Sequence, residues 1–417
     1  MSKNNIIVGL DIGTSRVRAV IASIKGKEEK RPKIIGIGES SSSGMRKGVV
    51  VDIEEMTKTL KRAIDQAERA SGISIEKAYV SVGGSHIKAR ESRGIVAVSR
   101  ADNEVSENDV LRAINSASAV SIDSNREVIH VIPREFKIDS QEGIQDPRGM
   151  TGVRLEVDTL IIEALSPYIK NLRKCLTGAG VEIEGLVLNI LAASEAVLSR
   201  KQKELGVLLL DFGGGTVGMT VYEERKLIHV HVLPVGSAHI TNDLAIGLRT
   251  SVEAAEKVKL GYGSCLTEEI DKKDTIDLSK IDEKEEGIVN RKEIAKIIEA
   301  RIDEIFNLVN KELKKIDRER LLPAGVVLVG GGAKIPGVID LAKERLKLPV
   351  QLGYPQGIDG LVDKVDDPAF ATAIGLIFWA LELRGAREGN KMFLPGRMPA
   401  SVNTVNKIKR WFRNFLP

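Results

Sequence analysis

The sequence has little cysteine, few aromatic residues and no long apolar run. Its two cysteines, Cys175 and Cys265, cannot form a disulfide framework, so we expect a protein of a reducing compartment. Aromatic residues make up 4% and charged residues 29% of the 417 residues, which indicates a globular chain with several packed cores. The apolar, uncharged stretch 368–381 is shorter than the about 20 residues that span a bilayer. We therefore predict neither a signal peptide nor a membrane-spanning helix.

Excess positive charge is confined to the end of the chain. The formal net charge is only +4, yet the residues from Arg384 onward hold eight Lys and Arg side chains against one acid, Glu388. The rest of the chain is slightly acidic, which argues against a nucleic-acid partner. Histidine is also scarce. Because His229 and His231 alternate on a predicted strand, we expect them to be structural rather than metal ligands.

Two segments repeat one pattern of strands and glycine turns. Strand-forming runs at 6–10, 17–24 and 33–37 are matched by runs at 206–210, 217–222 and 227–233. The Asp-x-Gly sequence at 11–13 returns at 211–213, in each case directly after the first strand. In the first copy, helical spacing follows and Gly72 ends it. We predict a duplicated β-β-β-α unit, one copy in each half, with a cleft between the halves.

Two interruptions of this pattern indicate inserted subdomains. We expect a first lobe at 1–84 and 159–202, an insert at 85–158, a second lobe at 203–235 and 312–384, a second insert at 236–311, a flexible linker at 385–400 and a terminal helix at 401–417. Within the second insert, the charged stretch 267–286 is expected to be a solvated excursion.

Three glycine-bearing turns predict a phosphate site. The segments 11–15 and 211–216 both place an aspartate, glycines and hydroxyl side chains at the end of a strand, and 330–337 follows a third strand. Glycine lets backbone N–H groups approach phosphate oxygens, and a carboxylate at a strand end can hold hydrated Mg²⁺. Either turn alone could be an ordinary Asp-Gly hairpin. Two opposed turns would clamp a polyphosphate and its metal.

These motifs carry a family resemblance. NIIVGLDIGTS, GVLLLDFGGGT, VVLVGGGAKIPG and DPAFATAIGL resemble the actin superfamily of ATP-binding proteins. More narrowly, the chain resembles the FtsA family of bacterial cell division proteins over essentially its whole length. The resemblance implies an α/β, actin-like ATPase fold of two ribonuclease-H-like lobes, each with an inserted subdomain, plus a C-terminal amphipathic helix.

The resemblance also implies roles for individual residues in binding ATP and Mg²⁺. Asp11 and Asp211 would hold Mg²⁺ through water. Phosphates, ribose and adenine would be held by Gly13, Thr14, Ser15, Gly213, Gly214, Gly215, Thr216, Gly330, Gly331, Gly332 and Lys334. Glu256 and Lys259 would meet the nucleoside, although an ordinary solvated helix face is an equal alternative.

One departure from the superfamily concerns catalysis. Relatives carry a water-positioning glutamate before the helix that links the halves, and here Ile190 is expected in its place, with Glu195 one turn later as an open substitute. A missing carboxylate predicts nucleotide binding with at most weak ATPase activity.

The terminal segment, 401–417, has the pattern of a helix that binds a membrane surface. Apolar residues recur at three- and four-residue intervals among cations, in a set that includes Val405, Ile408, Lys409, Arg410, Trp411, Phe412, Arg413 and Phe415. A basic amphipathic helix with aromatic anchors is typical of a helix lying in an anionic membrane interface. A helix that packs on the core or on a partner is the alternative.

The resemblance therefore implies an actin-like division protein at the cytoplasmic face of the bacterial inner membrane. It would polymerise with itself, anchor the FtsZ ring by binding the FtsZ C-terminal peptide on the second insert, and recruit later division proteins. On that insert, Arg301 would face outward from a helix whose buried stripe includes Ile294 and Ile302. The alternatives are a small-metabolite kinase of the same superfamily and a pilus-assembly adaptor like PilM.

Overall fold

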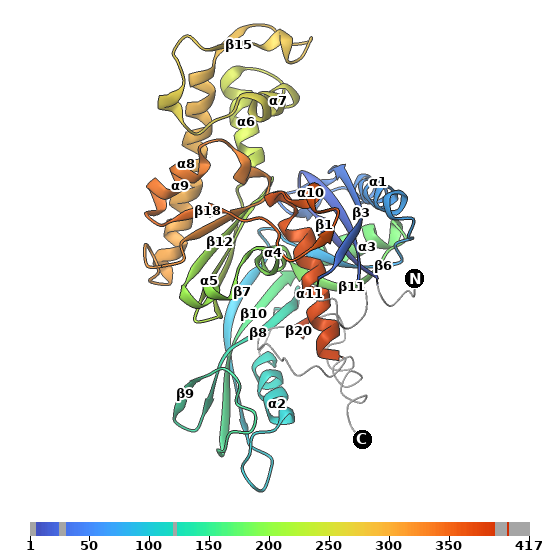
Figure 1. The fold of residues 1–417 in the computed structure, drawn as a ribbon, viewed down its shortest axis with the longest axis vertical. Coiled ribbons are helices and arrows are strands. Elements are labelled where there is room, and N and C mark those ends of the chain that lie inside the picture. The colour runs from blue at the N-terminus through green and yellow to red at the C-terminus, as the bar shows by residue number, and fades with distance from the viewer. Residues whose placement is uncertain (1–5, 25–30, 120–122, 388–397, 400–417) are drawn as a thin grey trace.

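The computed structural model describes residues 6–24, 31–119, 123–387 and 398–399, and has two lobes side by side, each with an inserted subdomain that extends away from the other (Figure 1). The predicted terminal helix at 401–417, with all of its proposed membrane residues, lies outside the described residues, as does most of the predicted linker.

The first lobe is built on a six-stranded sheet in the order β11-β6-β1-β2-β3-β19. Its strands are β1 (Ile6–Ile12), β2 (Arg16–Ser23), β3 (Lys33–Ser41), β6 (Lys77–Val82), β11 (Glu182–Leu188) and β19 (Asp359–Gly360), and a small hairpin joins β4 (Met45–Arg46) to β5 (Val49–Val50). The predicted β-β-β meander is confirmed: β1 pairs antiparallel with β2, and β2 with β3.

Helices cover both faces of this sheet. They are α1 (Ile53–Ser71), α3 (Ser166–Gly178), α4 (Asn189–Val197), α10 (Val362–Val365) and α11 (Ala371–Arg387). A Cβ on Gly38 would lie 1.9 Å from the carbonyl oxygen of Ala63 in α1, and one on Gly9 would lie 2.7 Å from that of Ala373 in α11. Gly9 and Gly38 pair with adjacent residues of β2, which point to opposite faces, so α1 and α11 sandwich the sheet.

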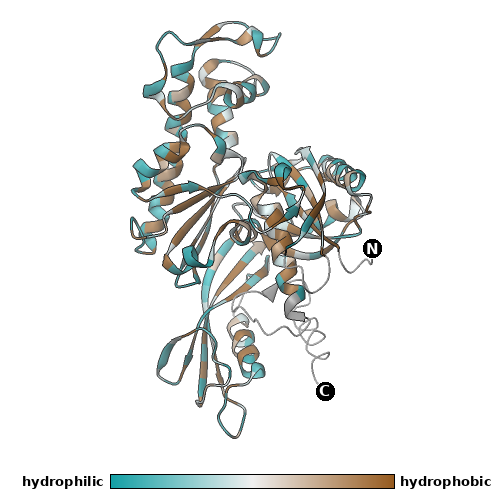
Figure 2. Ribbon diagram, viewed as in Figure 1, coloured by the Kyte–Doolittle hydropathy of each residue, from teal (hydrophilic) through white to brown (hydrophobic). Residues whose placement is uncertain are grey.

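The second lobe repeats this design in a five-stranded sheet, ordered β14-β13-β12-β17-β18. Its elements are β12 (Val207–Phe212), β13 (Val217–Glu223), β14 (Lys226–Leu233), β17 (Val326–Val329), β18 (Val350–Leu352), α5 (Arg200–Leu205), α8 (Arg291–Lys315) and α9 (Val338–Leu346). Apolar residues gather on the strands of both sheets and on α11 (Figure 2). Buried side chains of α4, including Leu191, belong to one cluster with Leu10 of the first lobe and Leu209 of the second, so the two lobes share a core.

The first insert is a separate small layer of sheet and helix. It contains β7 (Lys88–Ala97), β8 (Arg126–Ile138), β9 (Gln141–Ile144), β10 (Arg154–Leu165) and α2 (Glu107–Ser118), with strand order β20-β8-β10-β7 and β9 beside β8. The helix begins with a capping box in which the Ser106 and Asp109 side chains each bond the other's backbone N–H. Its buried face has its own core with the sheet.

The second insert is mainly helical. It contains α6 (Ser237–Leu248), α7 (Val252–Tyr262), β15 (Thr275–Asp277), β16 (Ile288–Asn290), the short 3₁₀ turns η2 (Thr267–Glu269) and η3 (Leu278–Lys280), and most of α8. The charged stretch 267–286 is thus more ordered than a plain excursion, because Ile276 and Leu278 are buried against the helices. The predicted stripe on α8, which includes Ile294 and Ile302, is fully buried.

Several predicted boundaries fall inside continuous elements. Helix α8 passes through the division at 311/312, strand β10 passes through that at 158/159, and α11 runs to Arg387 within the predicted linker. The two-residue strand β20 (Met398–Pro399) also lies in that linker and pairs with β8. Where elements of an insert continue into a lobe, the sequence has no break in periodicity that would locate the junction. Among the described residues, no helix has both the length and the apolar character needed to cross a membrane.

Candidate functional site

A cavity of about 600 Å³ lies between the two lobes, and every residue expected to hold a nucleotide lines it. From the first lobe these are Asp11, Gly13, Thr14 and Ser15; from the second lobe and its insert they are Asp211, Gly213, Gly214, Gly215, Thr216, Glu256, Lys259, Gly330, Gly331, Gly332 and Lys334. Segments more than 300 residues apart in the sequence thus share one wall of the cavity.

The two hairpins have the same backbone geometry. The N–H of Gly13 donates to the carbonyl of Arg16 at 3.0 Å, and the N–H of Gly213 donates to the carbonyl of Thr216 at the same distance. The hairpins also meet: a Cβ on Gly214 would lie 1.9 Å from the Oγ of Ser15. A side chain at position 214 would have to displace the Ser15 hydroxyl, and glycine instead leaves bare backbone facing the other lobe.

Both aspartates of the site have a raised pKa, and burial is the main cause in each case. Asp11 accepts a hydrogen bond from the Ser81 hydroxyl at 2.9 Å and lies 3.9 Å from Arg18. Burial raises the pKa of Asp11, although Arg18 and Ser81 oppose that rise. Burial, and then the negative charge of Asp11, raise the pKa of Asp211 to about 7. The two carboxylates repel each other, and Arg18, which lies 3.9 Å from Asp11, is shared with Glu39 at 2.9 Å, so the pair is short of positive charge.

This shortage fits a hard divalent cation. Carboxylates, hydroxyls and water are the oxygen donors that Mg²⁺ takes, and it keeps much of its hydration. The Oδ1 of Asn189 is buried without a hydrogen-bond partner among the described residues, while its Nδ2 donates toward Asp211 at 3.4 Å. An unpaired acceptor beside two carboxylates can bond a metal-bound water, so the donor set suits Mg²⁺ held through water.

The third glycine loop lines the cavity directly beside Asp211. Gly330 has φ of 86°, which favours glycine, and a Cβ there would lie 2.5 Å from Oδ1 of Asp211. The loop continues as the 3₁₀ turn η4 (Gly331–Lys334) rather than entering an α-helix directly, and α9 begins after Gly337. The Lys334 ammonium pairs with Asp367, which holds this wall against the turn η5 (Pro368–Phe370).

Glu256 and Lys259 form a compact network on α7. The Lys259 ammonium donates to Glu256 at 2.6 Å and to the Thr241 hydroxyl at 2.8 Å, and Thr241 donates to Glu256 at 2.5 Å. Lys259 is buried, so this face of α7 is not an ordinary solvated surface. Both side chains line the cavity, as the resemblance implied.

The polar residues of the cavity wall that sequence reasoning missed include Arg18, Ser81, Asn189 and Asp367. Arg18 and Ser81 lie within apolar strands, where a polar side chain on a buried face is itself a signal. Asn189 begins α4 directly after β11, and a strand end next to a helix start is a typical ligand position in such sheets.

The position of the absent glutamate also needs correction. Ile190 is fully buried and does not line the cavity; the neighbouring Asn189 does. Glu195, the suggested substitute, pairs instead with Lys203 at 2.9 Å and is not part of the cavity wall. Glu195 lies on a different face of α4 from Asn189. Because it is the one glutamate of this helix, no glutamate of α4 faces the cavity.

Arg301 does not face outward as expected. Its Nε and Nη2 donate to the two oxygens of Asp243 at 2.6 and 2.9 Å, and it also pairs with Glu304. This fork-to-carboxylate contact joins α8 to α6. Because the guanidinium is already engaged within the insert, it is a structural link rather than a free receptor for an acidic peptide.

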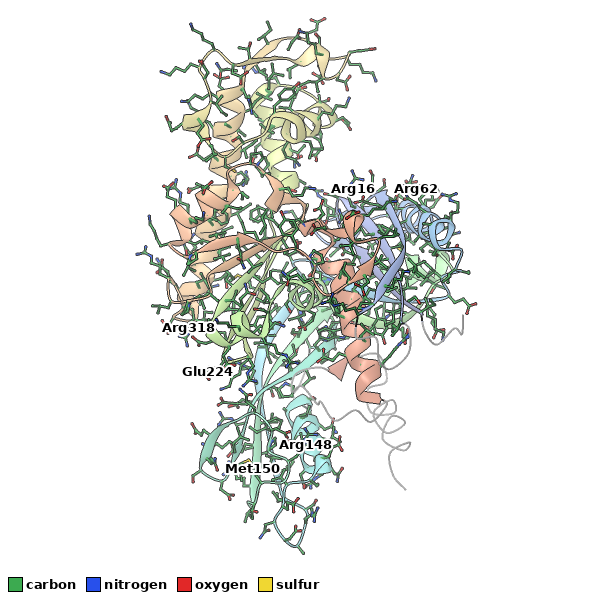
Figure 3. All side chains as sticks on the ribbon, viewed as in Figure 1. Arg16, Arg62, Arg148, Met150, Glu224 and Arg318 are labelled. Atoms are coloured by element: carbon green, nitrogen blue, oxygen red, sulfur yellow. The ribbon has the colours of Figure 1, made fainter. Side chains whose placement is uncertain are left out.

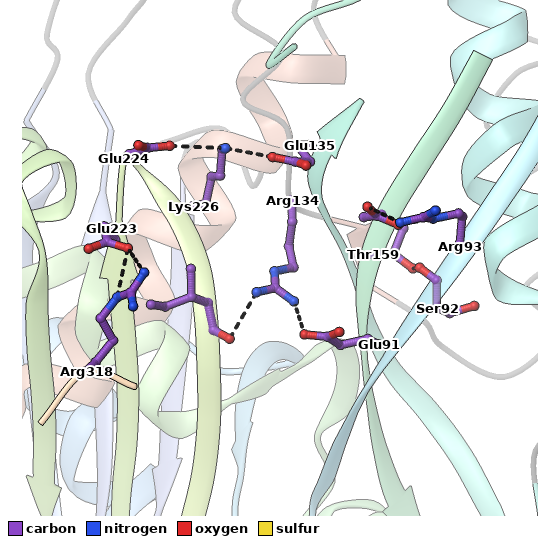
Figure 4. A pocket seen from close by; sticks show the side chains of 12 residues that line it. Glu91, Ser92, Arg93, Arg134, Glu135, Thr159, Glu223, Glu224, Lys226 and Arg318 are labelled. Carbon is purple, nitrogen blue, oxygen red and sulfur yellow. Dashed lines mark hydrogen bonds and ion pairs between the residues drawn. The ribbon is translucent and has the colours of Figure 1, made fainter. Parts of the chain in front are cut away.

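A second cavity, of about 620 Å³, lies where the first insert meets the second lobe, and contains none of the predicted site residues (Figure 4). Its charged lining is paired: Lys226 bonds Glu135 at 2.8 Å, and Arg318 bonds Glu223 at 2.8 Å. Figure 3 shows Arg318 and Glu224 at this junction, with Arg148 farther along the insert. The Lys226–Glu135 pair crosses from the second lobe to the first insert, as does the hydrogen bond from Arg134 to the carbonyl of Ile228, so this cavity lies at a joint between subdomains.

Comparison with known proteins decides the family. Residues 208–375 match the family described as cell division protein FtsA, and residues 84–163 match the SHS2 domain inserted in FtsA. Cell division protein FtsA of Pseudomonas aeruginosa is 36% identical over 99% of this chain and 98% of its own length. The Bacillus subtilis protein is 38% identical over 94% and 88%. The chain belongs to the FtsA family. It is an actin-like cell division protein, and the kinase and pilus-adaptor alternatives are not favoured.

Solved structures agree on the fold. A PilM–PilN type IV pilus biogenesis complex matches 89% of this chain and 97% of its own, with a TM-score of 0.64 and 17% identity. MreB5 of Spiroplasma citri bound to ADP matches 92% and 99%, with a TM-score of 0.54 and 14% identity. At these identities the likeness establishes the actin-like fold alone, while the FtsA relatives establish the family.

Proposed function

We propose that this FtsA-family chain binds Mg²⁺ and ATP in the cavity between its lobes. The observation that supports this most strongly is the pair of matching hairpins, one from each lobe, with Asp11 and Asp211 beside each other. Bound Mg²⁺ would supply the positive charge that offsets the two carboxylates and the phosphates. Gly13 and Gly213 would hold phosphate oxygens through backbone N–H groups, and Glu256 with Lys259 would meet the nucleoside.

Hydrolysis is expected to be slow. Phosphoryl transfer to water needs a positioned nucleophile, and the residue of α4 that lines the cavity, Asn189, carries an amide rather than a carboxylate. An amide can hydrogen-bond water but is a poor proton acceptor. We expect turnover below about one per second, which is under the usual range of enzymes.

Binding is tested by titrating a fluorescent ATP analogue against the full chain with and without Mg²⁺. Asp11→Asn should weaken Mg²⁺-dependent binding at least about tenfold, because it removes one of the two carboxylates. The matched control is Asp363→Asn, an exposed aspartate away from the cavity. Equal affinity for the Asp11 variant and the wild type would contradict the proposal.

We further propose that the chain polymerises and anchors FtsZ to the membrane through residues 401–417, at the cytoplasmic face of the bacterial inner membrane. The four cations of this segment, Lys407, Lys409, Arg410 and Arg413, would contribute roughly 1 kcal/mol each near anionic lipid. Each large apolar side chain would contribute about 1.5 kcal/mol or more if it is buried in the membrane. The ordering of a short helix offsets part of this gain. One tail would bind reversibly, and several tails on a polymer would hold firmly through avidity.

Co-sedimentation with anionic vesicles tests the anchor. The full chain should sediment with the vesicles, more strongly with ATP, and a chain ending at Ala400 should stay in solution. Neutral vesicles control for charge, and Lys409→Glu with Arg410→Glu should reduce binding to anionic vesicles alone. Sedimentation that is unchanged by truncation would contradict this role for the tail. Addition of FtsZ to the same assay tests the partner, because vesicle-bound chain should bring FtsZ down with it.

A further inference from the structure

Two histidines and a glutamate converge where helix α8 meets the edge strand β14. The Nε2 of His229 lies 3.6 Å from Oε2 of Glu312, and the Nδ1 of His231 lies 3.8 Å from the same oxygen. All three ligand atoms lie within 4.8 Å of one another, and within the described part of the chain no other group of histidine, cysteine and acidic side chains comes together in this way. None of the three lines the cavity between the lobes.

The strand register explains why both imidazoles face the helix. His229 and His231 pair with Val221 and Met219 of β13, which are fully buried in the core that includes α8. Residues two apart on a strand share a face. The edge strand therefore presents imidazoles where the neighbouring strand presents apolar side chains, and a carboxylate from α8 faces them. Polar groups are costly in such a position unless they have partners.

One of the proposed ligand atoms has no other partner in the part of the chain that the structure describes. The Nε2 of His229 is buried without a hydrogen-bond partner among the described residues.

The distances are close to those of a metal centre. Ligand bonds of about 2.0–2.1 Å in a tetrahedron place ligand atoms about 3.3 Å apart. The two nitrogen-to-Oε2 distances, 3.6 and 3.8 Å, exceed this by a few tenths of an ångström, and the two nitrogens lie within 4.8 Å of each other, so a bound ion would draw the side chains closer together. The other oxygen of Glu312 accepts a hydrogen bond from Lys315 at 2.6 Å, which fixes the carboxylate in the way that outer partners orient metal ligands. The side chain of His231 is 40% exposed, so water can reach a fourth position.

We propose that His229, His231 and Glu312 bind one divalent transition-metal ion, with Zn²⁺ as the fitting occupant, and that this ion fixes α8 to the edge of the second-lobe sheet. Two imidazoles and one carboxylate form a ligand set that Zn²⁺ uses, and Zn²⁺ binds nitrogen ligands more tightly than Mn²⁺ or Fe²⁺ does. A metal at this place would make the sequence expectation wrong, since it held that both histidines are structural rather than metal ligands.

Zinc titration of the full chain tests this, after removal of metal with EDTA and in the absence of nucleotide. We expect the wild type to bind one Zn²⁺ per chain in competition with a chromophoric chelator. His229→Gln, His231→Gln and Glu312→Gln should each weaken binding at least about tenfold. Glu293→Gln removes an exposed carboxylate from the same helix and should bind Zn²⁺ as the wild type does. Co²⁺ should give visible absorption bands in the wild type, and the histidine variants should lose them.

Two further readouts separate metal binding from a folding defect. Zn²⁺ should raise the melting temperature of the wild type and of Glu293→Gln, and leave that of the His229→Gln, His231→Gln double variant unchanged. The far-UV circular dichroism of the double variant should match the wild type. The proposal is overturned if the wild type takes up no Zn²⁺, or if the double variant binds it with the same stoichiometry and affinity.

Discussion

Substitution of Asp211 by asparagine should stabilise the empty protein while it impairs Mg²⁺-dependent binding. In the folded chain, burial and the neighbouring Asp11 raise the pKa of Asp211 from 3.8 to about 7. A carboxyl group with a raised folded pKa favours folding when protonated, and this stabilising contribution is lost as pH rises from about 4 through 7. At pH 8, the ionised wild-type side chain therefore destabilises the folded state. An asparagine at this position would carry no such charge.

The size of the effect follows from the shift. About three pKa units correspond to about 4 kcal/mol at 1.36 kcal/mol per unit. The carboxylate is partly exposed to a cavity that water can enter, so we retain about half of this, about 2 kcal/mol. An amide at position 211 keeps the shape and can still accept from Asn189, which now donates toward Asp211 at 3.4 Å.

The assay is denaturant unfolding of the full chain at several pH values, without nucleotide or Mg²⁺. We expect Asp211→Asn to be about 2 kcal/mol more stable than the wild type at pH 8, with a difference that shrinks toward pH 4. Asp363→Asn, at an exposed site, should track the wild type throughout. A variant less stable than the wild type at pH 8, or a difference that does not change with pH, would refute the reasoning.

Three other substitutions probe separate parts of the structure. Gly330→Ala should reduce Mg²⁺–ATP affinity more than tenfold, because its Cβ would lie 2.5 Å from Asp211 and its φ is positive; a binding titration that gives wild-type affinity would contradict this. Ile302→Ala should cost about 2–5 kcal/mol of unfolding free energy, since the side chain is fully buried in α8, and a loss below about 1 kcal/mol would show that the site is not packed. Glu195→Gln should leave steady-state ATP turnover unchanged, because this carboxylate pairs with Lys203 outside the cavity; a large fall in turnover would place it in the reaction.

Much of the fold could be predicted because its signals are local. Strand β17 and helix α9 have the bounds that apolar runs and glycines indicate, and Gly72 ends α1 with φ of 71°. The correspondence of Asp11 with Asp211 also made the arrangement of the two lobes predictable. If the two halves fold alike, the same motif lies at the same strand end in each lobe, and a cleft between the lobes brings the two motifs together. The structure gives both hairpins the same register.

What the sequence could not supply depends on contacts between distant segments. Asn189 and Ile190 are neighbours, and only the angle at which α4 leaves β11 decides which of them faces the cavity. Arg301 reads as an exposed cation on a helix until α6 brings Asp243 against it. His229 and His231 gain a third ligand only because α8 passes the edge of the sheet. None of these contacts between distant segments produces a periodic pattern in the sequence from which it could be predicted.

The placement of the two aspartates bears on how a ligand could couple the lobes. Asp11 belongs to the first lobe and Asp211 to the second, and α4 and α11 connect the two through a shared core. Without a cation, the like charges oppose close approach of the hairpins, which otherwise meet at Gly214 and Ser15. A divalent ion with a polyphosphate would reverse the sign of that interaction, so ligand binding would favour the arrangement in which the two hairpins meet.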